Sequence, residues 1–161
     1  MKKVMLLMFP LFMGSGETSI PEVVFENERV IEHPIIIAPK SINKLVTALI
    51  HVESRGNDSV IGDKHLPGNE AVGALQIRPI MVREVNRILK IQGKAKRFKL
   101  KDRFDRQKSI HIFIIWKNHH YKGKSNETIA RCWNGGGDGY KMKSTEKYWG
   151  KVKQQLIAYN D

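Results

Sequence analysis

The stretch SINKLVTALIHVESRGNDSVIG, residues 41–62, determines the expected fold class of this chain. Its apolar residues recur at helical spacing, which predicts an amphipathic helix packed against a core. Ser41 is a suitable N-cap for this helix, and Gly56 is suited to end it. The positions that lie whole helical turns before Glu53 are all apolar, so Glu53 is expected on the apolar face at the end of the helix.

Two interpretations of Glu53 are open from this helix. Glutamate is rarely buried without a partner, which favours a boundary residue whose carboxylate bends out to solvent. The alternative is that apolar surroundings disfavour the charged form and raise the pKa from about 4.3 toward about 6. A carboxyl group with such a pKa is suited to act as a general acid near neutral pH. The helix does not decide between these interpretations, and the other motifs must.

The chain is strongly basic, with 28 lysines and arginines against 16 acidic residues and a net charge of +12. Its 161 residues are enough for one domain with a core of its own. Eleven basic and three acidic residues lie in the region Arg83–Lys108, which is usually a solvated face. The overall charge favours an anionic partner, such as nucleic acid, a membrane surface or an acidic cell-wall polymer.

The N-terminus has the order of a secretory signal peptide. Two lysines precede a short apolar run, and small residues follow it, so we expect a signal peptide over residues 1–16. The run is too short to span a bilayer, which needs about 20 apolar residues. Residues 17–40 contain several prolines and are expected to form an extended arm, and residues 41–161 the folded domain.

The rest of the chain indicates a mainly helical domain. Residues 57–69 are polar and rich in turn formers, which predicts a loop or a small β-hairpin insertion. The basic segment Lys90–Arg103 is expected to be a loop. Capping residues and apolar spacing predict further helices that start near Pro79, Asp105, Ser125 or Asn126, and Ser144 or Thr145.

Other reactive side chains point to no special chemistry. Cys132 is the single cysteine, so no internal disulfide is possible, and a buried apolar role is expected for it. The histidines have no spacing typical of metal ligands. The sequence WNGGGDG, residues 133–139, lacks the Lys-Ser/Thr of a phosphate-binding loop and is expected to be a turn that something approaches closely.

Four motifs together resemble the lytic transglycosylase (SLT) domain family, whose members are related to goose-type lysozyme. ALIHVESRGN is similar to the family's catalytic glutamate-serine motif, and AVGALQI to its GLMQI motif. IARCWNGG resembles the AYNxG motif, and STEKYWGKV resembles the ETxxYV motif. The chain departs from the family in the two residues between Gly73 and Gln76 and where Cys132 and Trp133 replace Ala-Tyr. These departures bear on the shape of the sugar-binding subsites.

The resemblance implies a lysozyme-like α+β fold and cleavage of the β-1,4 bond between N-acetylmuramic acid and N-acetylglucosamine in peptidoglycan. Glu53 would protonate the leaving oxygen and then act as a base on the muramyl C6 hydroxyl, which closes a 1,6-anhydro ring. Because the substrate supplies the nucleophile, a second carboxylate is not required. The resemblance implies no metal or cofactor, and a monomer in the periplasm or outside the cell that acts alone or with envelope machinery.

The resemblance also implies roles for four other residues. Gln76 and Asn134 would offer amide hydrogen bonds to sugar hydroxyl or N-acetyl groups. Tyr148 would hydrogen-bond near Glu53 and orient it. Ser54 would contact the substrate or fix the end of the helix. Outside the resemblance, these residues have ordinary structural roles in capping, turns and packing.

Three alternatives remain open from the sequence. A carboxylate in the loop after the helix, from Asp58, Asp63 or Glu70, would position water and give a lysozyme-like hydrolase. A basic helical module that binds nucleic acid would account for the charge, although the signal-like N-terminus and the four motifs argue against it. A catalytically inactive protein that binds glycan or helps to assemble a secretion machine would keep the same fold.

Overall fold

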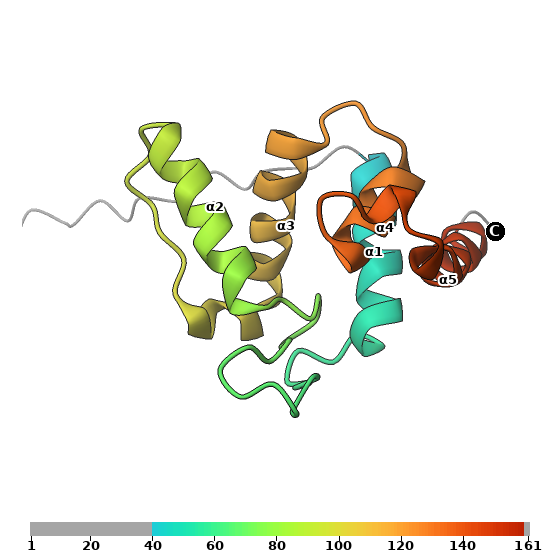
Figure 1. The fold of residues 1–161 in the computed structure, drawn as a ribbon, viewed down its shortest axis with the longest axis horizontal. Coiled ribbons are helices and arrows are strands. Elements are labelled where there is room, and N and C mark those ends of the chain that lie inside the picture. The colour runs from blue at the N-terminus through green and yellow to red at the C-terminus, as the bar shows by residue number, and fades with distance from the viewer. Residues whose placement is uncertain (1–39, 160–161) are drawn as a thin grey trace, which may run out of the picture. The chain divides into compact units, whose positions relative to one another are not determined.

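The computed structural model describes residues 40–159 of the chain, with side chains from Lys44 onward. The predicted signal peptide and the predicted arm up to residue 39 lie outside this range. The described part is mainly helical, as the sequence predicts (Figure 1). Within residues 40–159, no helix combines the length and the apolar character needed to cross a membrane.

Helix α1 (Lys40–Ser54) carries the stretch on which the sequence analysis depends. The helix begins at Lys40, so Ser41 lies inside it and the prediction that Ser41 is its N-cap is wrong by two residues. Its end is as predicted, because Arg55 and Gly56 adopt left-handed conformations with φ of 53° and 82°. Glycine adopts this conformation without steric cost. Glu53 therefore stands in the last turn of α1, next to a change in chain direction.

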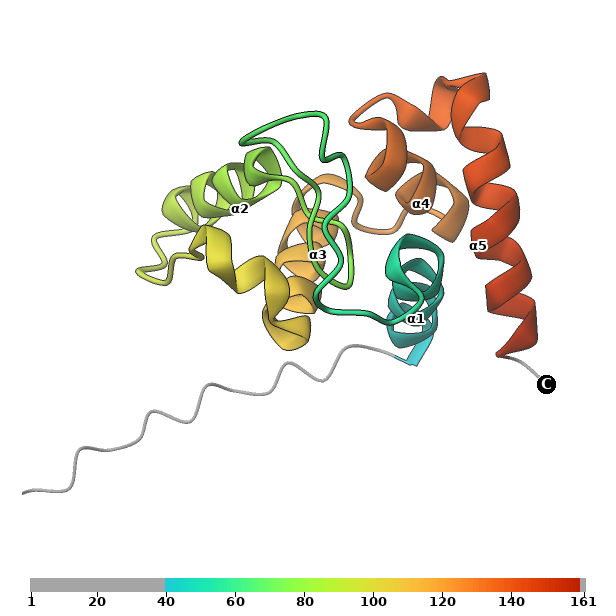
Figure 2. The same ribbon diagram turned by 90° about the horizontal axis from the view of Figure 1, so that it is seen from below.

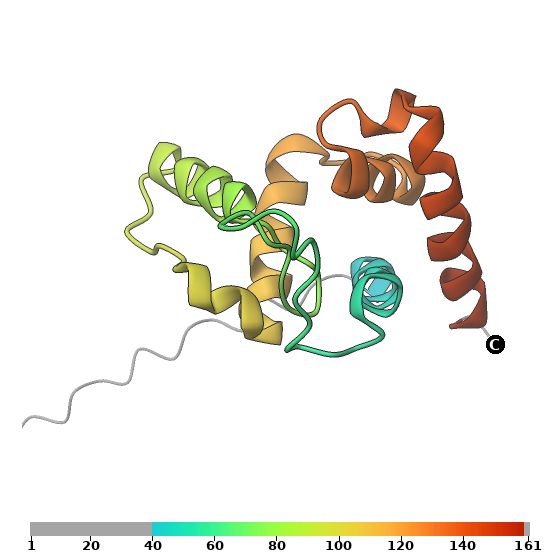
Figure 3. The same cartoon turned by 60° about the horizontal axis from the view of Figure 1, so that its bottom comes forward.

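Residues 55–78 form a long loop between α1 and α2 (Figures 2 and 3). It contains two isolated antiparallel bridges, from Val72 to Ile61 and to Ile77, but no strand, so the hairpin alternative is wrong. Arg103 anchors this loop, because its buried guanidinium donates to the backbone oxygen of Ile77 at 3.0 Å. A Cβ atom on Gly73 would lie 1.9 Å from the Arg103 backbone oxygen, so only glycine allows this close approach.

Helices α2 (Pro79–Ile91) and α3 (Arg106–His120) pack against each other. Pro79 occupies the first turn of α2, and Asp105 caps α3 by accepting from the Lys108 backbone N–H. Both starts confirm the predictions. Between the helices lies the 3₁₀ turn η1 (Leu100–Phe104), so the segment predicted as a loop is partly helical at both ends. One face of α2 is buried in the core: Val82, Val85, Ile88 and Leu89.

Helix α4 (Asn126–Gly135) is capped by Ser125, as predicted, and is followed by the short turns η2 (Gly139–Lys141) and η3 (Lys143–Thr145). The predicted Gly-rich turn starts later than expected, because α4 includes its first three residues and ends where Gly136 adopts a φ of 82°. Helix α5 (Glu146–Ala158) packs against α1 and α4. This contact brings the C-terminal helix beside the end of α1.

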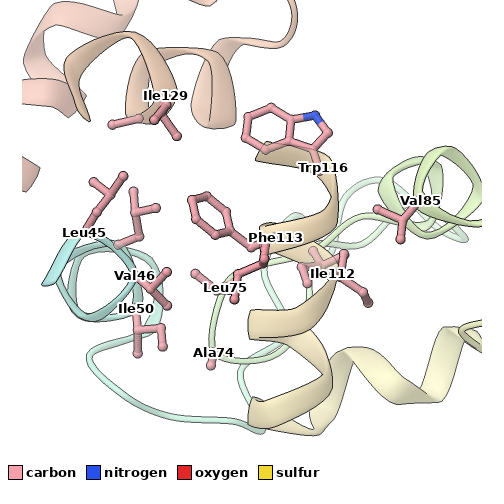
Figure 4. Close-up of a cluster of buried hydrophobic side chains, with 14 of the residues drawn as sticks. Leu45, Val46, Ile50, Ala74, Leu75, Val85, Ile112, Phe113, Trp116 and Ile129 are labelled. Carbon is pink, nitrogen blue, oxygen red and sulfur yellow. The ribbon is translucent and has the colours of Figure 1, made fainter. Parts of the chain in front are cut away.

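The core lies around the middle of α3, which contributes the buried residues Ile112, Phe113, Ile114 and Trp116. Figure 4 shows Phe113 between side chains from α1, α4 and the 55–78 loop. Leu45, Leu75 and Phe113 are at most 1% exposed, so the loop contributes to the same core as the helices. Burying a side chain of this size stabilises a fold by about 1.5–3 kcal/mol. The loop is therefore held in place by packing as well as by hydrogen bonds.

Candidate active site

Glu53 is paired with a tyrosine that lies 95 positions away in the sequence. The Tyr148 hydroxyl donates a hydrogen bond of 2.6 Å to Glu53 Oε1. Glu53 is in the last turn of α1 and Tyr148 is near the start of α5, so the packing of these two helices sets the geometry. This is the hydrogen bond that the family resemblance implies for Tyr148.

The surroundings of Glu53 favour its neutral form. Burial raises the pKa of Glu53 from an ordinary 4.5 to about 7, although the hydrogen bond from Tyr148 lowers it and the negative charge of Asp63 raises it. The helix-end alternative, a carboxylate bent out to solvent, therefore does not describe this residue. At neutral pH about half of the Glu53 carboxyl groups carry a proton.

The Tyr148 hydroxyl remains protonated at any working pH. Burial, together with the charge of Glu53 and the hydrogen bond to it, raises the pKa of Tyr148 well above its ordinary range. Tyr148 is thus a fixed donor toward Glu53 Oε1, which leaves the other carboxyl oxygen of Glu53 to face a ligand. A carboxyl group held in one orientation is a requirement for efficient proton transfer.

Glu53 lines a cleft of about 730 Å³, within the range of small-molecule sites. Gln76 and Asn134 line the same cleft, so three of the five residues predicted for the site line it, and a fourth, Tyr148, contacts Glu53. The walls of the cleft are formed by the loop 55–78, the start of α2 and the ends of α1, α3 and α4. The lining includes a polar pair, Asp63 and Arg78, and an aromatic set, Trp116, Tyr121 and Trp133.

Gln76 is held rigidly at the cleft wall. Its backbone has a φ of 48°, which is uncommon for a residue with a side chain and marks local strain. Its Nε2 group donates to the backbone oxygens of Gly73 at 3.0 Å and Val60 at 3.3 Å. Since both amide hydrogens have partners in the loop, Oε1 is the atom with which Gln76 would bind a ligand. Gln76 would therefore take part in the expected amide hydrogen bonding as an acceptor.

Asn134 and Ser54 have different positions. Asn134 is exposed in the last turn of α4 and lines the cleft. Ser54 is 8% exposed, and its hydroxyl lies 2.9 Å from the Ala74 backbone oxygen and 3.1 Å from the Ile50 oxygen. The prediction that Ser54 binds substrate is therefore corrected: its hydroxyl is engaged inside the protein. The predicted alternative is found, because Ser54 fixes the end of α1 to the loop.

An aromatic wall lines the cleft, and it was not predicted from the sequence as part of the site. The ring centroids of Trp116 and Trp133 are 5.1 Å apart, and those of Trp116 and Tyr121 are 4.8 Å apart. The edge-to-face and tilted arrangements are those that aromatic rings prefer. Trp116 belongs to the apolar run of α3, where the sequence signal for core packing conceals a second role, and Tyr121 directly follows this helix.

A charged pair also lines the cleft. Arg78 forms a salt bridge with Asp63, and both side chains line the cleft. Of the three loop carboxylates considered from the sequence, Asp63 is thus beside Glu53, whereas Asp58 pairs with Arg106 outside the lining. Glu70 is also outside the lining, and it accepts from the Gly68 N–H. Arg78 belongs to none of the four sequence motifs, so it was not predicted as a site residue.

The arrangement can donate and accept a proton at one carboxyl group inside a cleft with aromatic and amide walls. Among residues 40–159, no three histidine, cysteine, aspartate or glutamate side chains lie close enough to hold a metal ion. No model of a known protein family matches this chain, and no curated protein or solved structure shows significant similarity to it. The chemistry of the cleft therefore carries the functional argument.

Proposed function

We propose that the protein is a peptidoglycan lytic transglycosylase with a lysozyme-like fold and that Glu53 is its single catalytic acid and base. The observation that carries this proposal is the partly buried Glu53, with a pKa of about 7 and a hydrogen bond to Tyr148, in a cleft of about 730 Å³. The four sequence motifs support it, because the residues Glu53, Gln76 and Asn134 from three of them line one cleft.

A carboxyl group with a pKa near 7 is suited to both halves of this reaction. In its protonated form Glu53 gives a proton to the glycosidic oxygen as the bond to the anomeric carbon breaks. The carboxylate that results then takes the proton of the muramyl C6 hydroxyl, whose oxygen bonds to the anomeric carbon. The proton balance closes within one turnover, so Glu53 returns to its starting form.

The walls of the cleft suit a sugar chain. Sugar rings present apolar C–H faces that pack on aromatic side chains, and Trp116, Tyr121 and Trp133 provide such faces. Gln76 Oε1 and the Asn134 amide provide polar partners for hydroxyl and N-acetyl groups. The net charge of +12 favours residence on an anionic cell wall. Export to the cell envelope is part of the proposal, because residues 1–16 have the order of a signal peptide.

A second candidate, hydrolysis of the same bond, is favoured by the position of Asp63. This carboxylate lines the cleft with Glu53, and inverting glycosidases use a second carboxylate to activate water. Asp63 Oδ2 is, however, already engaged in the salt bridge with Arg78. We therefore place intramolecular attack by the C6 hydroxyl first.

Mass spectrometry of digested peptidoglycan sacculi tests the proposal. The expected products end in 1,6-anhydromuramic acid, and Glu53→Gln is expected to abolish their release while circular dichroism shows the fold unchanged. Glu146→Gln, which removes an exposed carboxylate at the start of α5, is the matched control and is expected to retain activity. Products with reducing muramyl ends would refute the transglycosylase proposal and favour hydrolysis. Full activity of Glu53→Gln would refute both proposed reactions.

A further inference from the structure

The outer side of α2 and the segment that follows it carry exposed aliphatic side chains. Ile80 is 62% exposed, Ile91 is 63% exposed and Leu100 is 50% exposed. Ile80 and Ile91 are separated by three helical turns, so they point in nearly the same direction, about 16 Å apart along α2. Of the aliphatic residues that are at least half exposed within residues 44–159, only Ile157 lies elsewhere.

The same surface is strongly basic. Residues 80–101 contain eight basic side chains and one acidic side chain, Glu84. Glu84 is already paired with Arg87 and His120, so it does not neutralise the other cations. Within the described range, no ion pair involves the exposed cations Arg83, Lys90, Lys94, Lys99 and Lys101.

Exposed aliphatic groups among unpaired cations fit one kind of partner. A nucleic acid or another linear polyanion attracts the cations, but its binding does not depend on burying isoleucine or leucine. A bilayer with anionic headgroups interacts favourably with both kinds of side chain, because the cations stay at the phosphates while the aliphatic groups enter the acyl boundary. We propose that this surface, formed by residues 80–101 and called here the α2 basic surface, docks on an anionic phospholipid bilayer.

The position of the α2 basic surface is compatible with an open cleft. Of its residues, only Ile80 and Met81 at the start of α2 line the cleft. The cations and the other two aliphatic residues lie outside the lining. In all three ribbon views, α2 and α5 lie at opposite ends of the described domain (Figures 1, 2 and 3). Docking through α2 therefore leaves α5 away from the bilayer, which supplies an internal control.

Vesicle binding of the full chain tests the charge and the aliphatic contacts separately. On vesicles of equal parts phosphatidylglycerol and phosphatidylcholine, replacing Lys90, Lys94, Lys99 and Lys101 by Gln is expected to reduce partitioning at least about 10-fold. The double variant Ile91→Ser with Leu100→Ser is also expected to reduce it at least about 10-fold. The matched control replaces four other exposed lysines by Gln, with the same change in net charge: Lys143, Lys147, Lys151 and Lys153.

A site-specific probe locates the contact independently of other membrane-binding parts of the chain. Cys132 is 1% exposed, so a nitrobenzoxadiazole label attaches selectively to an introduced Ile91→Cys or Ile157→Cys. The expected result is a blue shift on vesicles for the label at position 91 and none at position 157. Equal shifts at both positions, no shift at position 91, or equal loss of binding in both lysine variants would overturn the proposal. Binding to duplex DNA that the lysine variant loses and the aliphatic variant keeps, with no binding to vesicles, would overturn it in favour of a polyanion.

Discussion

The Tyr148 hydroxyl and Glu53 Oε1 are 2.6 Å apart, and this single hydrogen bond joins the last helix of the domain to the end of the first. It acts against burial, because it stabilises the charged form of Glu53 while burial destabilises it. The pKa of about 7 is the balance of these two effects and of the nearby charge of Asp63, which also raises it. Changes to either partner are expected to alter the pH dependence of the site in a defined direction.

Tyr148→Phe is expected to shift the pH profile of activity upward. Without the hydrogen bond, the carboxylate of Glu53 loses its stabilising donor, so the pKa rises above about 7 and the protonated acid persists to higher pH. Loss of orientation is expected to lower kcat by roughly 10- to 100-fold. The dependence of kcat/KM on pH measures the shift, and Tyr159→Phe, an exposed tyrosine at the end of α5, is the control. An unchanged profile would show that the hydrogen bond does not tune Glu53.

Glu53→Gln is expected to stabilise the protein at high pH but not at low pH. The pKa of Glu53 is about 7 in the folded protein and near 4.5 when the chain is unfolded, so the folded state binds more protons between these values. The contribution of Glu53 to stability is fully present below pH 4.5 and is lost as the pH rises through 7. Glutamine carries no charge, so the variant does not lose this stability as the pH rises.

Urea denaturation at about pH 4 and about pH 8 measures this difference. The free energy of unfolding of Glu53→Gln is expected to exceed that of the natural chain by at most about 3 kcal/mol at the higher pH, and to be similar at the lower pH. A difference between the two proteins that does not vary with pH would contradict burial of the charge as the cause.

Ser54→Ala is expected to destabilise the fold by about 1–2 kcal/mol, because it removes the buried hydrogen bond to the Ala74 backbone oxygen. The loss also frees the 55–78 loop from the end of α1, so activity is expected to fall with stability. Thermal denaturation gives the measurement. Ser59→Ala, in an exposed part of the same loop, is expected to stay within about 0.5 kcal/mol of the natural chain. Equal effects of the two substitutions would argue against the anchoring role.

Gly62→Ala is expected to weaken substrate binding at little cost in stability. A Cβ atom at this position would lie 2.3 Å from Gln76 Oε1, so the Gln76 side chain has to move. Losing one hydrogen bond to the ligand predicts a rise in KM of roughly fivefold. Steady-state kinetics on a soluble glycan fragment gives the comparison with Gly150→Ala in α5, where a Cβ atom meets open space. A KM unchanged in both variants would remove Gln76 from the binding site.

The helices were predictable because their signals are local. Pro79, Asp105 and Ser125 each begin or cap a helix at the expected position, since capping depends on residues within one turn. The 55–78 loop was less predictable, because its course depends on a contact with Arg103, far along the chain. The turn residues alone allow a loop or a hairpin, whereas the hydrogen bonds of the buried Arg103 guanidinium hold this segment as a loop.

The candidate active site was likewise predictable from the sequence only in part. Periodicity in the sequence placed Glu53 on an apolar face at a helix end, and a carboxyl group there is either bent to solvent or neutral. Only the tertiary structure decided between these outcomes, because burial, the hydroxyl of Tyr148 and the charge of Asp63 all come from outside the helix that carries Glu53. A pKa depends on everything within a few ångströms of the carboxyl group, and local sequence specifies only the residues of its own helix.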